Sequence, residues 1–169
     1  EDAYGNATSS DSVFTWTRDT ANPTMTITAS ESSDGTNQVA SGSSTKVSPL
    51  YLKLEASSSE TGFAVGDIVV TKDGTAISDT SGILSTFDDA SNPISYVTLT
   101  LATDGSADGV YTFEVPASSF TDSIGNNNVV SNTFTLTHDT TAPTASVTYS
   151  PAGPYKQGTT VSVTVVCNE

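Results

Sequence analysis

The stretch FTLTHDTTAPT at residues 134–144 repeats, with few changes, the stretch FTWTRDTANPT at residues 14–24. The two copies lie 120 positions apart, and 10 of 23 positions are identical when residues 2–24 are compared with residues 122–144. A fixed internal period is typical of repeat arrays. The period therefore predicts three parts of the chain, which are the end of one unit (1–18), one complete unit (19–138) and the beginning of a third unit (139–169).

The composition favours strands and turns over helices. Hydrophobic residues make up 35% of the 169 residues and occur in short alternating runs. Threonine is abundant, and its branched side chain packs well on a pleated sheet. No stretch has the 3.6-residue apolar spacing of a long amphipathic helix.

Seven such runs, separated by turn residues, predict the strands of the complete unit. The predicted strands are 24–29, 47–55, 67–71, 82–87, 95–102, 110–115 and 129–137. Short strands with a turn about every ten residues are typical of an all-β, immunoglobulin-like β-sandwich. The run VSVTVV at 161–166 is expected to be the second strand of the third unit.

The charge of the chain limits the classes of partner. The formal net charge is −14, because 19 acidic residues face only 5 lysines and arginines. Nucleic acid and anionic membrane surfaces are not expected as partners, since both require clustered basic residues. No apolar run is long enough to insert into a membrane within this window. A divalent cation is the natural partner of surplus carboxylates, although an acidic surface that only maintains solubility remains an alternative.

Cysteine and histidine are too few to indicate catalysis. Cys167 is the single cysteine, so it either pairs with a residue outside this sequence or is a buried thiol at a strand end. His138 is the single histidine, and the chain has no Ser-His-Asp or paired-carboxylate pattern. We therefore expect no enzyme activity. Trp16 is expected to be a packing residue, and the sequon at Asn6 permits glycosylation.

Acidic residues are expected to converge at one end of the sandwich. Residue Asp19 lies where the chain joins the unit, and alternating strand directions return two distant loops to that same end. One loop carries Glu55 or Glu60, the other carries Asp122 and Asn126, and Asp67 begins the next predicted strand nearby. Carboxylate, amide and backbone oxygens suit calcium, whereas zinc prefers histidine and cysteine.

The sequence thus predicts a calcium site at the joint between units. The candidate ligands are Asp19, Glu55, Glu60, Asp67, Asp122, Asn126, Asp139 and Glu169, of which the last two belong to the following joint. A purely structural alternative remains open. Aspartates such as Asp19 and Asp139 also bond to their own backbone in turns, and glycine and asparagine supply left-handed turn conformations.

Three motifs in this order carry a family resemblance. They are SETGFAVGDIVVT (59–71), DGVYTFEVPASSFTDSIGNNN (108–128) and HDTTAPT (138–144). The chain resembles the bacterial-type Ig-like (Big) tandem repeats of large extracellular surface and adhesin proteins. The resemblance implies an extracellular location and often calcium near the joints. The chain departs from it in the longer segment 34–49 and in the EASSSE loop, where Glu55 or Glu60 could hold the acidic position that normally follows the second strand.

The expected function is structural. Tandem repeats would form an extracellular stalk, an adhesin or a surface filament with calcium-stiffened joints, contacting neighbouring repeats, other filament subunits or a cell-surface ligand. Whether the end fragments are completed by the same or another chain stays open. The alternative is a binding module that recognises a carbohydrate or a partner protein through loops or a sheet face. Its candidate aromatic residues are Tyr51, Tyr96, Tyr111 and Phe120.

Overall fold

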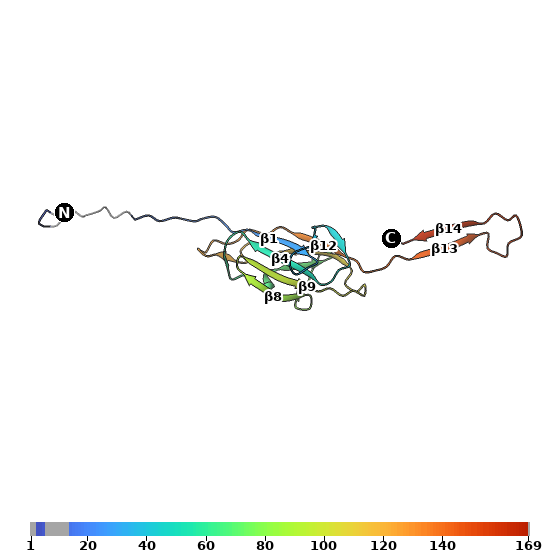
Figure 1. Ribbon diagram of the computed structural model, residues 1–169, viewed down its shortest axis with the longest axis horizontal. Coiled ribbons are helices and arrows are strands. Elements are labelled where there is room, and N and C mark those ends of the chain that lie inside the picture. The colour runs from blue at the N-terminus through green and yellow to red at the C-terminus, as the bar shows by residue number, and fades with distance from the viewer. Residues whose placement is uncertain (1–2, 6–13, 169) are drawn as a thin grey trace.

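The computed structural model describes residues 3–5 and 14–168, and this part of the chain is all-β without an α-helix (Figure 1). The strands are β1 (Met25–Ser30), β2 (Gln38–Val39), β3 (Ser43–Thr45), β4 (Leu50–Ala56), β5 (Glu60–Thr61), β6 (Val69–Lys72), β7 (Thr75–Ala76), β8 (Leu84–Ser91), β9 (Ile94–Leu99), β10 (Gly109–Glu114), β11 (Thr121–Asp122), β12 (Phe134–His138), β13 (Ala145–Ser150) and β14 (Ser162–Cys167). One 3-10 turn, η1 (Val65–Asp67), precedes β6.

Ten of these strands form two five-stranded sheets. The strand order is β2-β1-β4-β9-β8 in one sheet and β3-β12-β10-β6-β7 in the other. Neighbouring strands are antiparallel except β3, which runs parallel to β12. The all-β architecture expected from the sequence is confirmed, and the paired sheets are consistent with a β-sandwich.

The core lies between the two sheets because alternate residues of each strand point to one face. Leu52, Leu54 and Val97 come from one sheet and are 0% exposed. Phe113 and Leu136 come from the other sheet and are equally buried. Burying such a side chain contributes about 1.5–3 kcal/mol. The polar residues that alternate with them, mostly threonine and serine, cover the outer faces.

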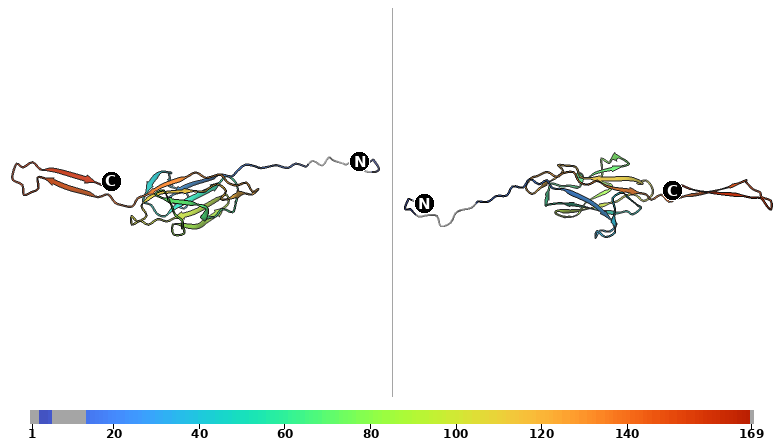
Figure 2. Two further views of the ribbon diagram at one scale, coloured as in Figure 1. Left: turned by 180° about the vertical axis from the view of Figure 1, so that it is seen from behind. Right: turned by 90° about the horizontal axis from the view of Figure 1, so that it is seen from above.

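The remaining four strands form two small sheets outside this core. The pair β5–β11 joins two loops at the end of the sandwich where residues 19–24 enter, which we call the N-terminal pole. The pair β13–β14 is a hairpin that lies apart from the two large sheets in every view (Figure 2). It follows the opposite end, the C-terminal pole, where residues 138–141 leave the sandwich.

Several predicted strands change in length or start. The strand expected over 129–137 begins only at Phe134, because the residues before it bond elsewhere. The N–H of Val129 donates to the carbonyl of Pro23 at 3.0 Å. The side-chain amide of Asn132 pairs with both backbone groups of Ile27, at 2.7 and 3.0 Å. The short strands β2, β3, β5, β7 and β11 were not predicted.

Candidate functional site

Three segments far apart in sequence meet at the N-terminal pole. The side-chain amide of Asn22 donates to the carbonyl of Asn127 at 2.7 Å. Thr24 and Ser57 are linked in both directions, by Thr24 N–H to Ser57 Oγ at 3.0 Å and by Ser57 N–H to Thr24 O at 2.9 Å. The linker, the loop after β4 and the loop after β11 therefore lie together, as the strand alternation predicts.

The predicted ligands Glu60 and Asp122 face each other in this region. They are register partners in the β5–β11 pair, and opposite residues of an antiparallel pair have their Cβ atoms about 4.5–5.5 Å apart. The backbone of Glu60 is fixed from a third side by Asn92, whose amide accepts from Glu60 N–H at 2.9 Å and donates to Glu60 O at 2.6 Å. The backbones of these two acidic residues are thus held side by side, while Glu60 Oε2 accepts the N–H of Phe63 at 3.3 Å.

The carboxylate of Asp122 is already engaged within its own loop. Its Oδ1 accepts the backbone N–H groups of Ile124, Gly125 and Asn126 at 2.8–2.9 Å. Its Oδ2 accepts the side-chain amide of Asn126 at 2.9 Å. This amide, followed by the backbone N–H of Asn126, holds the pKa of Asp122 below its ordinary value. Asp122, which is 6% exposed, shapes the glycine- and asparagine-rich loop.

The other predicted ligands of this pole have separate local partners. Asp19 Oδ1 accepts the N–H of Ala21 at 2.8 Å. Asp67 does not begin a strand but ends η1, and its Oδ2 accepts the N–H of Ala64 at 2.8 Å. Glu55 lies on β4 and forms an ion pair with Lys53 at 2.7 Å. Glu60 is therefore closer to the role of the loop acid than Glu55, because only Glu60 faces Asp122.

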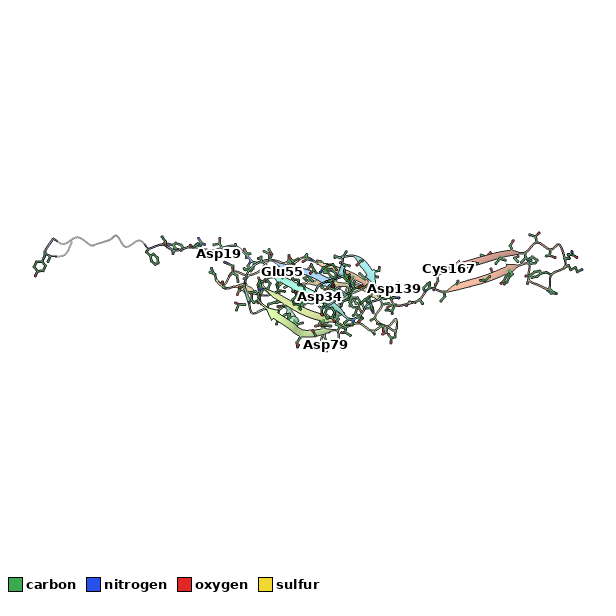
Figure 3. All side chains as sticks on the ribbon, in the orientation of Figure 1. Asp19, Asp34, Glu55, Asp79, Asp139 and Cys167 are labelled. Carbon is green, nitrogen blue, oxygen red and sulfur yellow. The ribbon has the colours of Figure 1, made fainter. Side chains whose placement is uncertain are left out.

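The predicted ligands of the following joint lie elsewhere. Asp139 is at the C-terminal pole, at the opposite end of the sandwich from Asp19 (Figure 3). Its Oδ1 accepts the N–H of Thr141 at 3.1 Å, which matches the turn bond of Asp19. Glu169 lies outside the described residues. Its role as a ligand of the following joint stays a prediction.

Several other aspartates act as turn caps. Oδ1 of Asp34, Asp79 and Asp104 each accepts both the N–H and the hydroxyl of the residue two positions later, which are Thr36, Ser81 and Ser106. The hydroxyl, and then the backbone N–H, lowers the pKa of each carboxyl. Hydrogen bonds within these turns thus stabilise the ionised forms of the three aspartates.

The N-terminal pole has the donor chemistry of a calcium site, but some of its carboxylate oxygens already accept hydrogen bonds within the chain. Hard carboxylate and amide oxygens are suitable ligands, yet Asp122 already accepts four hydrogen bonds. Over residues 3–5 and 14–168, no three or more histidine, cysteine, aspartate or glutamate side chains are grouped so as to hold one metal ion. Calcium at this pole stays a prediction that rests on Asp19, Glu60, Asp67 and Asp122.

The carboxylate with the most contacts to a linker was not predicted. Asp108 accepts four hydrogen bonds from Thr140 and Thr141 at the C-terminal pole. In the sequence Asp108 belongs to an ordinary turn, TDGSADG, and its partners lie more than thirty residues later. No local pattern marks such a long-range contact.

The four aromatic candidates divide into two groups. Tyr111 and Phe120 are 3% exposed and belong to the core. Tyr51 and Tyr96 are half-buried on the outer face of their sheet, where they lie opposite Thr98 and Lys53 respectively. Only the second pair is available to a ligand.

Within the described residues, no helix has the length and apolarity needed to cross a membrane. Comparison of the chain with protein-family models, with curated proteins and with solved structures finds no match.

Proposed function

We propose that the chain is part of a tandem array of immunoglobulin-like sandwiches that serves as an extracellular stalk, adhesin or surface filament. The strand order supports the immunoglobulin-like assignment. Strands β1-β4-β9-β8 follow the order A-B-E-D, and β12-β10-β6 follow the order G-F-C. The cysteine pair of antibody domains has no counterpart here, since Cys167 is the single cysteine.

One observation carries the array. Strand β13 (Ala145–Ser150) begins and ends 120 residues after β1 (Met25–Ser30). The two strand ladders also begin at equivalent positions, because Met25 faces Ala56 in β4 and Ala145 faces Cys167 in β14, although Cys167 follows Ala56 by 111 residues and not by 120. The 120-residue spacing of the sequence therefore holds for the first strand, which supports the array, while a shorter connection brings the second strand nine residues earlier.

The hydrogen bonds next to these strands repeat as well. Thr144 N–H donates to Asn168 Oδ1 at 2.7 Å, and Asn168 N–H donates to Thr144 O at 3.2 Å. This reciprocal pair corresponds to the pair between Thr24 and Ser57. It supports the interpretation of residues 139–168 as the beginning of another unit rather than as an unrelated tail.

Calcium is a separable part of the proposal, supported by the register pairing of the acidic residues Glu60 and Asp122. Its test is thermal unfolding of the chain with millimolar calcium and with a chelator. We expect calcium to raise the melting temperature by mass action, and Glu60→Gln to abolish the increase. Glu55→Gln is the matched control, because Glu55 lies on the sheet and pairs with Lys53. An identical melting temperature with calcium and with chelator would contradict the calcium site but not the array.

The array itself is tested by whether one unit folds on its own. A protein of residues 19–144 is expected to unfold cooperatively with a melting temperature close to that of the whole chain, since the apolar core lies between Met25 and Leu136. Loss of cooperative unfolding on removal of the flanking segments would contradict the proposed unit.

A binding role remains the second candidate, and a sheet face supports it. Tyr51 and Tyr96 lie on the same outer face of neighbouring strands β4 and β9. Aromatic side chains with one exposed face are suited to contacts with partner proteins. Replacing both tyrosines with alanine should then abolish binding to a cell-surface extract component while leaving the melting temperature of the sandwich nearly unchanged.

A further inference from the structure

The residues that leave the sandwich at its C-terminal pole are held by the carboxylate of Asp108. Its Oδ1 accepts the N–H of Thr140 at 2.9 Å and the hydroxyl of Thr140 at 2.8 Å. Its Oδ2 accepts the N–H of Thr141 at 3.1 Å and the hydroxyl of Thr141 at 2.6 Å. Hydrogen bonds to an ionised acceptor are stronger than neutral ones. One side chain therefore fixes two successive residues of the linker through both backbone and side chain.

Neighbouring backbone groups add to this attachment. The N–H of Gly105, in the same turn as Asp108, donates to Thr140 Oγ1 at 3.0 Å. The N–H of Asp139 donates to the carbonyl of Thr45 at 3.1 Å, at the end of the parallel pair β3–β12. Residues 139–141 are thus bonded to two different parts of the sandwich that precedes them.

The other end of the linker is bonded to the structure that follows. Thr144 forms its reciprocal pair with Asn168 at the end of β14. Between Thr141 and Thr144 only Ala142 and Pro143 remain, and the ring of proline fixes its φ angle. In the complete unit, Pro23 is the counterpart of Pro143. The carbonyl of Pro23 accepts the N–H of Val129 at 3.0 Å.

We propose that residues 139–144, together with Asp108, form a hydrogen-bonded latch that holds the joint after this sandwich at a defined orientation without a metal ion. Asp108 is the positioning residue of the latch on the preceding unit, and Thr144 is the attachment point on the following one. This inference rests on the proposed function, because it takes β13 and β14 as the start of the next unit. The joint is then stiffened by the hydrogen bonds of residues 139–144, and any calcium at the N-terminal pole adds to this stiffness.

The latch is tested by amide hydrogen exchange in the chain of residues 1–169. In the unaltered protein we expect the amides of Thr140 and Thr141 to be protected, equally with calcium and with chelator. In Asp108→Ala they should exchange at least about tenfold faster, since four bonds to a charged acceptor are lost. The matched control is Asp104→Ala, which removes a carboxylate from the same turn whose bonds go only to Ser106.

A second variant keeps the test decisive if Asp108→Ala does not fold. In Asp108→Asn the side chain keeps one acceptor oxygen and gains a donor, so it satisfies only one of the two threonines. Exchange should accelerate at one of the amides of Thr140 and Thr141 and not at the other. The latch is overturned if both amides exchange freely in the unaltered protein, if both keep their protection in the Asp108 variants, or if protection requires calcium.

Failure of the latch and failure of the array give different results. Free exchange of the amides of Thr140 and Thr141, together with cooperative unfolding of residues 19–144, would contradict the latch but not the array. If these amides are protected but residues 19–144 do not unfold cooperatively, the array is contradicted and the bonds of Asp108 are only a local contact.

Discussion

Two strand pairs of the molecule have the same register and opposite environments. In β1–β4, the residues Met25, Ile27 and Leu54 are at most 3% exposed. In β13–β14, the side chains are exposed throughout, and Val147 and Val165, which correspond to Ile27 and Leu54, are 49% and 59% exposed. The two strands of a pair can therefore keep the same register whether or not their apolar side chains are buried.

Pairing follows from local alternation and from the bonds at the strand ends, which both hairpins share. Burial requires a second sheet, and for β1–β4 that sheet is built from residues as distant as Phe134 and Leu136. An isolated two-stranded hairpin is marginally stable in water at best. Under the proposed array, the apolar side of β13–β14 is the first part of the core of the next unit.

The largest expected difference between the two pairs is in core truncation. Leu54→Ala should lower the free energy of unfolding by about 2–5 kcal/mol, because a fully buried leucine leaves a cavity. Val165→Ala, at the corresponding place in β14, should change it by no more than about 0.5 kcal/mol. Urea unfolding followed by far-UV circular dichroism measures the change in the free energy of unfolding for both variants. Equal effects would show that the hairpin is packed in solution.

Thiol accessibility gives the next largest contrast. Cys167 is exposed and should react with a thiol reagent at the rate of a free peptide cysteine. In a Cys167→Ser background, Ala56→Cys places a thiol at the corresponding position of β4, where Ala56 is 3% exposed. This thiol should react on the order of a hundredfold more slowly, since reaction requires local opening. Similar rates would contradict the difference in burial.

A smaller effect concerns the part of strand β1 that β2 does not pair with. The amide of Asn132 bonds both backbone groups of Ile27 on the side away from β4, and β13 has no such partner among the described residues. Asn132→Ala should cost about 1–3 kcal/mol, because Ile27 N–H loses its acceptor. Chemical denaturation measures the cost, and Asn127→Ala, which removes an exposed side chain from the neighbouring loop, is the control.

The smallest effect is a local response to acid. Bonds from Asn126 and its neighbours lower the pKa of Asp122, so the ionised form favours the folded loop. The contribution of the loop to stability is fully present above the ordinary carboxyl pKa, about 3.9. It is lost as pH falls through the lowered pKa. Amide exchange of Gly125 should accelerate only in that acidic range, and Asp122→Asn should remove the pH dependence.

The alternation of apolar residues was enough to predict most of the large strands. For β4, the run of leucines at 50, 52 and 54 places three buried side chains on one face, and the structure has them there. The short strands were not predictable in this way. Strand β5 has two residues, and it exists because Thr61 and Glu60 meet β11 some sixty residues later.

The candidate site was predictable only in part for a similar reason. Strand directions indicate which loops meet, and they brought Glu60 and Asp122 together. They do not indicate what each carboxylate bonds, so the engagement of Asp122 by its own loop and of Glu55 by Lys53 could not be inferred. Asp108 was missed because its partners, Thr140 and Thr141, are identified only by the folded chain.

Residues 19–138 are proposed to be one period of an array. This proposal is tested most directly by a protein in which residues 1–138 are followed by a second copy of residues 19–138, studied by calorimetry and small-angle scattering. Because Asp19 then takes the place of Asp139, we expect twice the unfolding enthalpy of one unit at nearly the same melting temperature, with the scattering of two units joined end to end. An enthalpy equal to that of one unit, with a disordered second copy, would contradict it.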